Sequence, residues 1–250
     1  MMEQGRMSAQ VQSQNIADEG QMTIVEHLEE LRDRLIVIAV ALVISTAFSF
    51  LFTDKLIKLL EAPVPKGQMI IAIHPVEALI AWFKVALIAG VALAMPVILY
   101  EVVRFLLPGL TPQEKRYLVF LVPGGTLFFI IGLSFANFLM LPAAVPFLQG
   151  IMKDTVTQQW TIENYISFVT TILFWMGVIF ELPLVMFFLG KLRIVSTQKL
   201  IKFFRYWVVL ASVIAAVVTP TPDPVNMMIV MVPLLMLYVV GIVLVKLSGA

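Results

Sequence analysis

The chain has 250 residues, of which 60% are hydrophobic and only 13% are charged, and its mean hydropathy is +0.98. A soluble domain of this length is about half apolar and about a quarter charged. The composition therefore excludes a soluble enzyme, a disordered chain and a nucleic-acid-binding domain. The net charge of +1 says little by itself, because in a membrane protein the placement of charge matters more than its sum.

The residue types that often carry chemistry are scarce. There is no cysteine, so no disulfide, thiolate metal site or cysteine nucleophile can form, and His27 and His74 are the two histidines. The sequence also contains no H-E-x-x-H motif, no Walker loop and no glycine-flanked serine of the nucleophile-elbow type. We expect a protein without a cofactor, a metal site or an enzymatic activity.

The N-terminal part of the chain is polar. Residues 1–22 are rich in glutamine and poor in apolar side chains, which predicts a disordered tail. Thr23 and Glu26 then form a capping box, which predicts that a helix begins there. Apolar residues at helical spacing predict that residues 23–34 form an amphipathic helix on the cytoplasmic membrane surface, with these residues on its apolar face: Ile24, Leu28, Leu31 and Leu35.

Six apolar segments are long enough, or nearly long enough, to cross a bilayer core of about 30 Å as helices. None alternates between apolar and polar residues as a barrel strand does, so the predicted fold is an all-α bundle of six transmembrane helices. Prolines within or beside these spans can bend them, which favours a curved, concave wall. Alternatively, neighbouring helices re-satisfy the freed carbonyls and the prolines have no functional consequence. The predicted spans are 35–52, 76–100, 117–141, 162–189, 206–219 and 225–245, with prolines at Pro96, Pro123, Pro183 and Pro233.

The lysines and arginines indicate the orientation of the bundle. With the N-terminus in the cytoplasm, twelve of the seventeen lie on the cytoplasmic side, four lie on the outer side, and Lys84 lies inside the second span. This bias predicts that both termini are cytoplasmic. The twelve are Arg6, Arg32, Arg34, Arg104, Lys115, Arg116, Lys191, Arg193, Lys199, Lys202, Arg205 and Lys246, and the four are Lys55, Lys58, Lys66 and Lys153.

Two acidic features on the cytoplasmic side are candidate binding groups. The amphipathic helix carries an acidic face that includes Glu30, although surface anchors are usually basic because the inner leaflet is anionic. That excess of acid favours a site for a cationic ligand over a simple anchor with pairs such as Glu30–Arg34. Glu114 lies in a second capping box with Thr111, so it either caps the third span or combines this role with ligand binding.

Glu181 lies inside the fourth span. An acid at membrane depth costs roughly 2.5–3.5 kcal/mol on insertion scales, and such residues usually face a bundle interior or a wet cavity. We expect Glu181 to form a polar patch in a concavity at lipid level. The alternative is a structural hydrogen-bonding centre with a neutral carboxyl group.

The fifth predicted span is short. Its 14 residues, 206–219, extend about 21 Å as a helix, which is well below the bilayer core. Asp223 is then expected to cap the sixth span, with Pro224 at the first helical position. We expect the resulting hairpin to be the docking edge for a single-span partner, which would contact an apolar face formed by Met227, Val230 and Met231.

Short motifs in a defined order give the chain a resemblance to a known family. From residue 22 onward it resembles TatC, the polytopic core of the twin-arginine protein translocase. The motifs are His27-Leu28-Glu29-Glu30-Leu31-Arg32, Ala62-Pro63, Pro96-Val97-Ile98-Leu99-Tyr100, Leu107-Pro108-Gly109-Leu110, Glu114-Lys115-Arg116, Phe180-Glu181-Leu182-Pro183, Thr219-Pro220 and Asp223. The N-terminal tail is longer than is usual in that family.

The resemblance implies a receptor that exports folded proteins whose signal peptides carry two adjacent arginines. It places signal recognition on Glu30 and Arg32 and on Glu114 with its neighbours Lys115 and Arg116. It implies a structural role for Pro63, Pro96 and Asp223, and a concave face around Glu181. It also implies a plasma-membrane location, single-span partners of the TatA/TatB type and a homo-oligomer within the complex.

Two other functions compete with this interpretation. An ion- or proton-coupled secondary transporter would also use an intramembrane acid such as Glu181, but it usually shows internal repeats and several polar residues at the midplane. An intramembrane protease would need a nucleophile or paired acids, and the spans contain neither. The transporter remains the alternative hypothesis.

Overall fold

The computed structural model describes residues 24–64, 70–106, 112–150, 159–219, 224–247 and 249, without the side chains of 24, 106 and 112–119. The predicted tail 1–22 and Asp223 lie outside this part. The helices are α2 (Ile24–Ser49), η1 (Phe50–Phe52), α3 (Thr53–Leu60), α4 (Pro75–Leu106), α5 (Pro112–Phe135), η2 (Ala136–Met140), α6 (Leu141–Gly150), α7 (Ile162–Phe180), α8 (Leu182–Lys191), α9 (Thr197–Val218) and α10 (Pro224–Leu247).

Six of these helical stretches are long and apolar enough to cross a membrane, namely Val25–Leu60, Pro75–Phe105, Phe120–Gly150, Ile162–Lys191, Thr197–Val218 and Pro224–Leu247. Within the described ranges the extended backbone is limited to one isolated bridge between Ile71 and Thr161. The predicted all-α membrane bundle of six spans is therefore confirmed.

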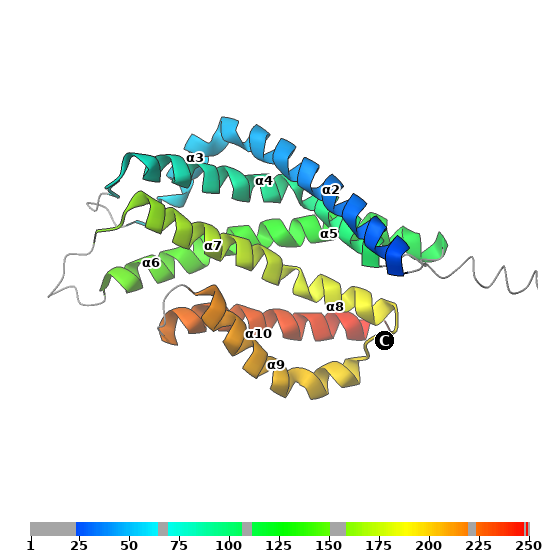
Figure 1. Cartoon of the computed structure of the whole chain (residues 1–250). Helices are drawn as coiled ribbons and strands as arrows, with labels where there is room; N and C mark the ends of the chain where they lie inside the picture. The colour runs from blue at the N-terminus through cyan, green and yellow to red at the C-terminus, as the bar shows by residue number, and fades with distance from the viewer. Residues whose placement is uncertain are drawn as a thin grey trace, which may run out of the picture.

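The helices lie in successive layers, which Figure 1 shows from top to bottom. α2 packs on α4, α4 packs on α5 and α7, and α8, α10 and α9 form the last layer. The largest buried cluster centres on α7 and includes Tyr165, whose hydroxyl donates to the carbonyl oxygen of Leu60 at 2.6 Å. This bond ties the end of α3 to α7 across the layers.

The first span differs from its predicted boundaries. The expected surface helix 23–34 and the expected span 35–52 form one uninterrupted helix, α2, which then tightens into a 3-10 turn and continues as α3. The predicted apolar face is not buried in the protein, since Leu28 and Leu35 are more than half exposed and Leu31 is only half-buried. The sequence placed a boundary at Arg34 because charge ends there, but nothing in the backbone chemistry interrupts the helix.

The third and fourth spans contain irregular turns. In the third span a π-helical turn at Ala136–Met140 precedes α6, and the amide of Leu141 donates to the carbonyl of Ala136. Pro142 follows directly and cannot donate to Phe138, so the wider turn accommodates the missing bond. In the fourth span the helix breaks at Glu181, just before Pro183, as expected for a proline. Pro96, Pro123 and Pro233 lie within continuous helices.

The predicted shortness of the fifth span is wrong. α9 has 22 residues, Thr197–Val218, which corresponds to about 33 Å of helix. The apolar segment 206–219 is only its second part, because the helix already contains Lys199, Lys202 and Arg205. Lysine and arginine are good helix formers, so these charges end the apolar segment without ending the helix.

α2 depends on α4 for its place in the bundle, and Gly90 sets how closely the two helices approach. A Cβ atom added at Gly90 would lie 2.8 Å from Thr46 Cα. Backbone atoms cannot move aside as a flexible side chain can, so this position requires glycine.

We expect Gly90→Ala to separate α2 from α4 and to lower the free energy of unfolding by about 1–3 kcal/mol, the usual cost of overpacking. Thermal unfolding of the purified chain in detergent micelles, followed by circular dichroism, measures the change. Gly124→Ala is the matched control, because its added Cβ meets Leu184 Cδ1 at an ordinary 3.7 Å. Equal effects of the two variants would contradict the assigned contact.

Candidate functional site

An ion-pair cluster joins α2 to the end of α4. Arg34 Nη2 lies 2.5 Å from Glu30 Oε1, and Arg34 Nη1 lies 2.5 Å from Glu101 Oε2. The three side chains are only 14%, 19% and 10% exposed, respectively. One guanidinium thus bridges two carboxylates in a partly desolvated place, where such bonds are stronger than at an open surface.

Local helix geometry produces this cluster. Glu30 and Arg34 are four residues apart on α2, so their side chains are neighbours on one face. Glu101 comes from the last turns of α4, which packs along α2. One turn before Glu30, the His27 ring stacks on Phe105 with 4.5 Å between centroids. The stack and the ion pairs together fix the ends of both helices.

One carboxylate oxygen in the cluster remains free. Glu30 Oε2 is buried and accepts no hydrogen bond from the described residues. A buried acceptor without a donor costs roughly 1–3 kcal/mol. Glu30 therefore still has capacity for a further donor.

The predicted binding residues have different surroundings. Arg32 is about two-thirds exposed and pairs with its neighbour Asp33 at 2.9 Å. Glu114, Lys115 and Arg116 lie in the first turns of α5, but their side chains are outside the described residues. Figure 1 shows the start of α2, the end of α4 and the start of α5 at the same end of the molecule.

The pairing of Glu101 with Arg34 was not predicted from the sequence. The second span was expected to end at Tyr100, and Arg34 was expected to pair only with Glu30 within one helix. A signal was present, because Glu101 directly follows the predicted span 76–100, and acids near membrane depth usually face the bundle interior and pair with another group. Only the packing of α2 on α4 shows that Glu101 meets Arg34.

Glu181 lies at the junction of α7 and α8, and this residue is only 7% exposed. Neither of its carboxylate oxygens has a hydrogen-bond partner among the described residues, and the same holds for Trp207 Nε1. Both residues line a cavity of about 500 Å³ between α7, α8, α9 and α10, whose other lining is apolar. The expected polar group in a concavity is therefore present in this geometry.

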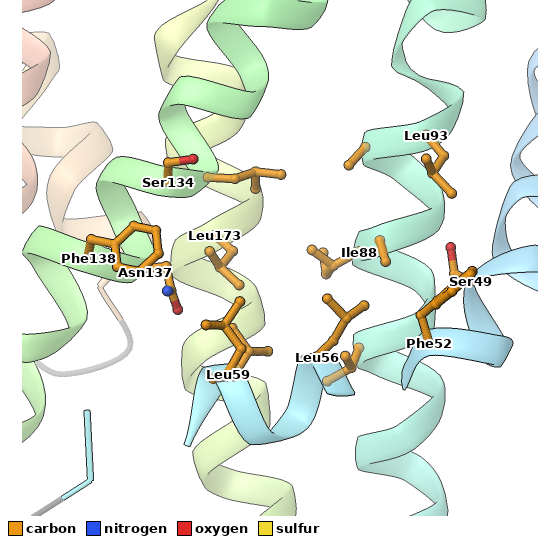
Figure 2. A pocket seen from close by; sticks show the side chains of 15 residues that line it. Ser49, Phe52, Leu56, Leu59, Ile88, Leu93, Ser134, Asn137, Phe138 and Leu173 are labelled. Carbon is orange, nitrogen blue, oxygen red and sulfur yellow. The ribbon is translucent and has the colours of Figure 1, made fainter. Parts of the chain in front are cut away.

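A second cavity is almost wholly apolar. It measures about 360 Å³ and lies between α3, α4, α7 and the π-helical turn. Figure 2 shows Asn137 and Phe138 on one side of it and Ile88 and Leu93 on the other. No lining residue titrates, so this cavity can accommodate an apolar group but offers no acid–base chemistry.

The predicted docking face on α10 is wrong for the single chain. Val230 is 1% exposed and belongs to the main core, and Met227 and Met231 pack partly buried against it. The residues that point outward on the same helix are Met228, Val232 and Met236. The three-to-four spacing was read correctly as one face, but it is the face that packs on the rest of the bundle.

Two residues with an expected structural role, Pro63 and Pro96, lie in the described part of the chain. Pro63 follows α3 in a turn in which the amide of Val64 donates to the carbonyl of Glu61. Pro96 lies inside α4 with its side chain exposed.

Comparison with known proteins decides the family. A family model described as "Sec-independent protein translocase protein (TatC)" matches residues 26–233. The chain belongs to the TatC family. As a member it is a component of a protein translocase and not an enzyme, and the comparisons give no support to the secondary transporter.

Relatives and solved structures agree. This TatC chain is 40% identical to the chloroplastic TatC of Arabidopsis thaliana over 237 residues, covering 94% of this chain and 70% of the relative. It is 36% identical to TatC of Aquifex aeolicus, covering 91% and 96% of the two chains. A crystal structure of "Twin Arginine Translocase Receptor- TatC" superposes with a TM-score of 0.79 at 36% identity, covering 90% of this chain and 100% of that one.

We expect Glu181→Gln to keep most of the protein export by this TatC, whereas Glu181→Leu lowers it. Glutamine retains hydrogen-bonding atoms for the cavity, and leucine does not. Export of a twin-arginine substrate into membrane vesicles measures both. Equal loss in the two variants would instead show that the negative charge is required.

Proposed function

We propose that one end of this TatC protein recognises the two arginines of a signal peptide. This end, which we call the Arg34 end, is formed by the start of α2, the end of α4 and the start of α5. The observation that supports this is the arrangement of two carboxylates around a single guanidinium. Arginine binds carboxylates through paired N–H groups in a fixed planar fork, and lysine cannot reproduce that geometry. A site that already holds one arginine between Glu30 and Glu101 therefore has the chemistry that a twin-arginine signal needs.

Arg34 occupies this site before any peptide arrives. A signal arginine can bind the free Glu30 Oε2, or it can displace Arg34 from Glu101. Both routes exchange one guanidinium for another, so the carboxylates do not have to be desolvated anew. Glu114 remains a proposed second partner at the same end of the bundle, and Arg32, Lys115 and Arg116 remain proposed contacts on the strength of the family resemblance.

The orientation follows from the charges at the two ends. The Arg34 end also carries the exposed Arg104, Lys191 and Arg193, whereas Lys55 and Lys58 lie at the opposite end. Positive residues concentrate in cytoplasmic loops. We therefore propose that the Arg34 end and both termini face the cytoplasm and that the protein lies in the plasma membrane of a prokaryotic cell.

The α9–α10 hairpin is the proposed docking edge for TatA/TatB-type single-span subunits. Its outward face consists of Val209, Val213 and Val217 on α9 and Met228 and Met236 on α10, all more than half exposed. These replace Met227, Val230 and Met231 as the residues that can touch a partner. A homo-oligomer within the complex belongs to the same proposal.

We expect reporter fusions after Lys153 and Lys199 to report opposite sides of the membrane, outer and cytoplasmic respectively. An alkaline phosphatase and a green fluorescent protein fusion at each position measure this. The same side for both positions would contradict the proposed topology.

We expect Glu30→Gln to weaken binding of a twin-arginine peptide roughly tenfold, since truncating a charge pair costs 2–5 kcal/mol when buried and less when partly wet. We expect Arg34→Gln to strengthen binding, because it removes the internal competitor. Titration of the peptide against the full chain in nanodiscs measures both, and a twin-lysine peptide shows the background.

Arg104→Gln is the matched control for Arg34→Gln, because Arg104 is exposed at the same end and lies over the Tyr100 ring. It removes the same charge without freeing the cluster. Weaker binding by Arg34→Gln would show that Arg34 organises the site and does not compete. Glu114→Gln keeps the hydrogen-bonding capacity of a helix cap but loses the charge, so unchanged binding would leave Glu114 only its capping role.

A further inference from the structure

A second charged cluster lies far from Arg34, where the first halves of α4 and α7 meet. Lys84 Nζ lies 3.8 Å from Glu163 Oε1 and donates to Ser167 Oγ at 2.6 Å. Lys84 is the tenth residue of α4, which places it about 14 Å along the helix from Pro75. A lysine at such depth within a spanning helix marks a functional site by default.

Hydroxyl side chains extend this cluster along α7. Glu163, Ser167, Thr170 and Thr171 recur at helical spacing and therefore share one face. Each hydroxyl donates to a backbone carbonyl one turn earlier, at 2.5 Å for Ser167, 2.6 Å for Thr170 and 2.7 Å for Thr171. Their donors are thus used within the helix, and their lone pairs remain available to accept hydrogen bonds.

A cavity of about 390 Å³ opens along this polar face, and we call it the Lys84 groove. Four of its ten lining residues are polar, namely Lys84, Ser167, Thr170 and Thr171. Figure 1 shows the two helices that carry these residues, α4 and α7, side by side. Trp175 lines both this groove and the Glu181 cavity, so one indole lies between the two spaces along α7.

The donor and acceptor set of the groove limits what it can bind. An anion would meet the carboxylate of Glu163, and a metal cation would meet the ammonium of Lys84. Among the described residues no group of three acidic or histidine side chains could hold a metal ion. Glu163 pairs with Lys84 but does not line the cavity. An extended peptide backbone fits the lining, because it offers carbonyl acceptors to Lys84 and amide donors to the hydroxyl oxygens of the threonines.

We propose that the Lys84 groove binds the extended backbone of the passenger segment that follows the signal peptide. This proposal rests on the proposed function, in which the Arg34 end holds the signal on the cytoplasmic side. A polar chain that crosses an apolar layer loses its hydrogen bonds to water, and each unsatisfied group costs several kcal/mol. The polar side chains of the groove replace part of those hydrogen bonds in the half of the bundle that contains Lys84 and Ser167.

The absence of cysteine allows a clean test of this proposal. Thr171→Cys places a single thiol in the groove with little change in shape. Ser134→Cys is the matched control, because Ser134 is also a hydroxyl bonded one turn back, at 2.8 Å, but lines the apolar cavity of Figure 2. The passenger carries one cysteine downstream of its twin-arginine signal, and the complete translocase is used in membrane vesicles.

We expect a disulfide between the passenger and Thr171→Cys during transport, and none with Ser134→Cys or with a twin-lysine passenger. No disulfide at position 171, or equal yields at both positions, would overturn the proposal. Lys84→Met is expected to slow transport roughly tenfold, Lys84→Arg to keep most of it, and both to leave signal-peptide affinity unchanged.

The affinity for the signal peptide, measured beside transport, separates this proposal from the proposed function. If Lys84→Met lowers peptide affinity and transport together, Lys84 is only structural and the groove assignment fails. If Glu30→Gln leaves peptide affinity unchanged, the recognition assignment at the Arg34 end fails instead. Unchanged transport by Lys84→Met would also overturn the groove.

Discussion

A charged side chain inside an apolar bundle must find a partner or pay for its desolvation, and this constraint organises the polar features of the molecule. Arg34 meets it by bridging Glu30 and Glu101, and Lys84 meets it with Glu163 and Ser167. Both clusters lie between helices that are far apart in sequence. Each therefore fixes one end of the contact that α4 makes with its neighbours, and each provides a polar group that an apolar wall would lack.

The two clusters differ in a way that suits two separate tasks. Around Arg34 the acids exceed the bases, and a buried carboxylate oxygen accepts no hydrogen bond from the described residues, which supports the proposed selectivity for a cation with the geometry of arginine. Around Lys84 the charges balance and hydroxyl groups line the groove, which supports the proposal that it binds a neutral polar chain. In the proposed function, recognition and passage are thus carried by opposite ends of α4, the helix that contributes to both clusters.

Glu181 is the exception to the rule of pairing. Its carboxylate and the indole N–H of Trp207 both lack partners among the described residues, and both line one cavity. Gly125 allows α5 to approach it, since an added Cβ there would lie 2.8 Å from Glu181 Oε2. An unpaired polar site persists only where surrounding structure holds it in place, which favours a role that uses the unpaired state.

Much of the molecule follows from the sequence, because a span needs about twenty apolar residues and composition shows them directly. The six spans were predicted on that basis, whereas the bend at Pro183 and the start of α10 at Pro224 were predicted from the backbone chemistry of proline. Helix boundaries that were predicted at charged residues were less accurate. α2 and α9 continue through such residues, because lysine, arginine and glutamate favour helices as much as apolar residues do. Side-chain partners were decided only by tertiary structure. Hydrophobic spacing identified one face of α10 but not whether it packs inward, and no local pattern could show that Glu101 meets Arg34, since the packing of α2 on α4 brings together residues 67 positions apart.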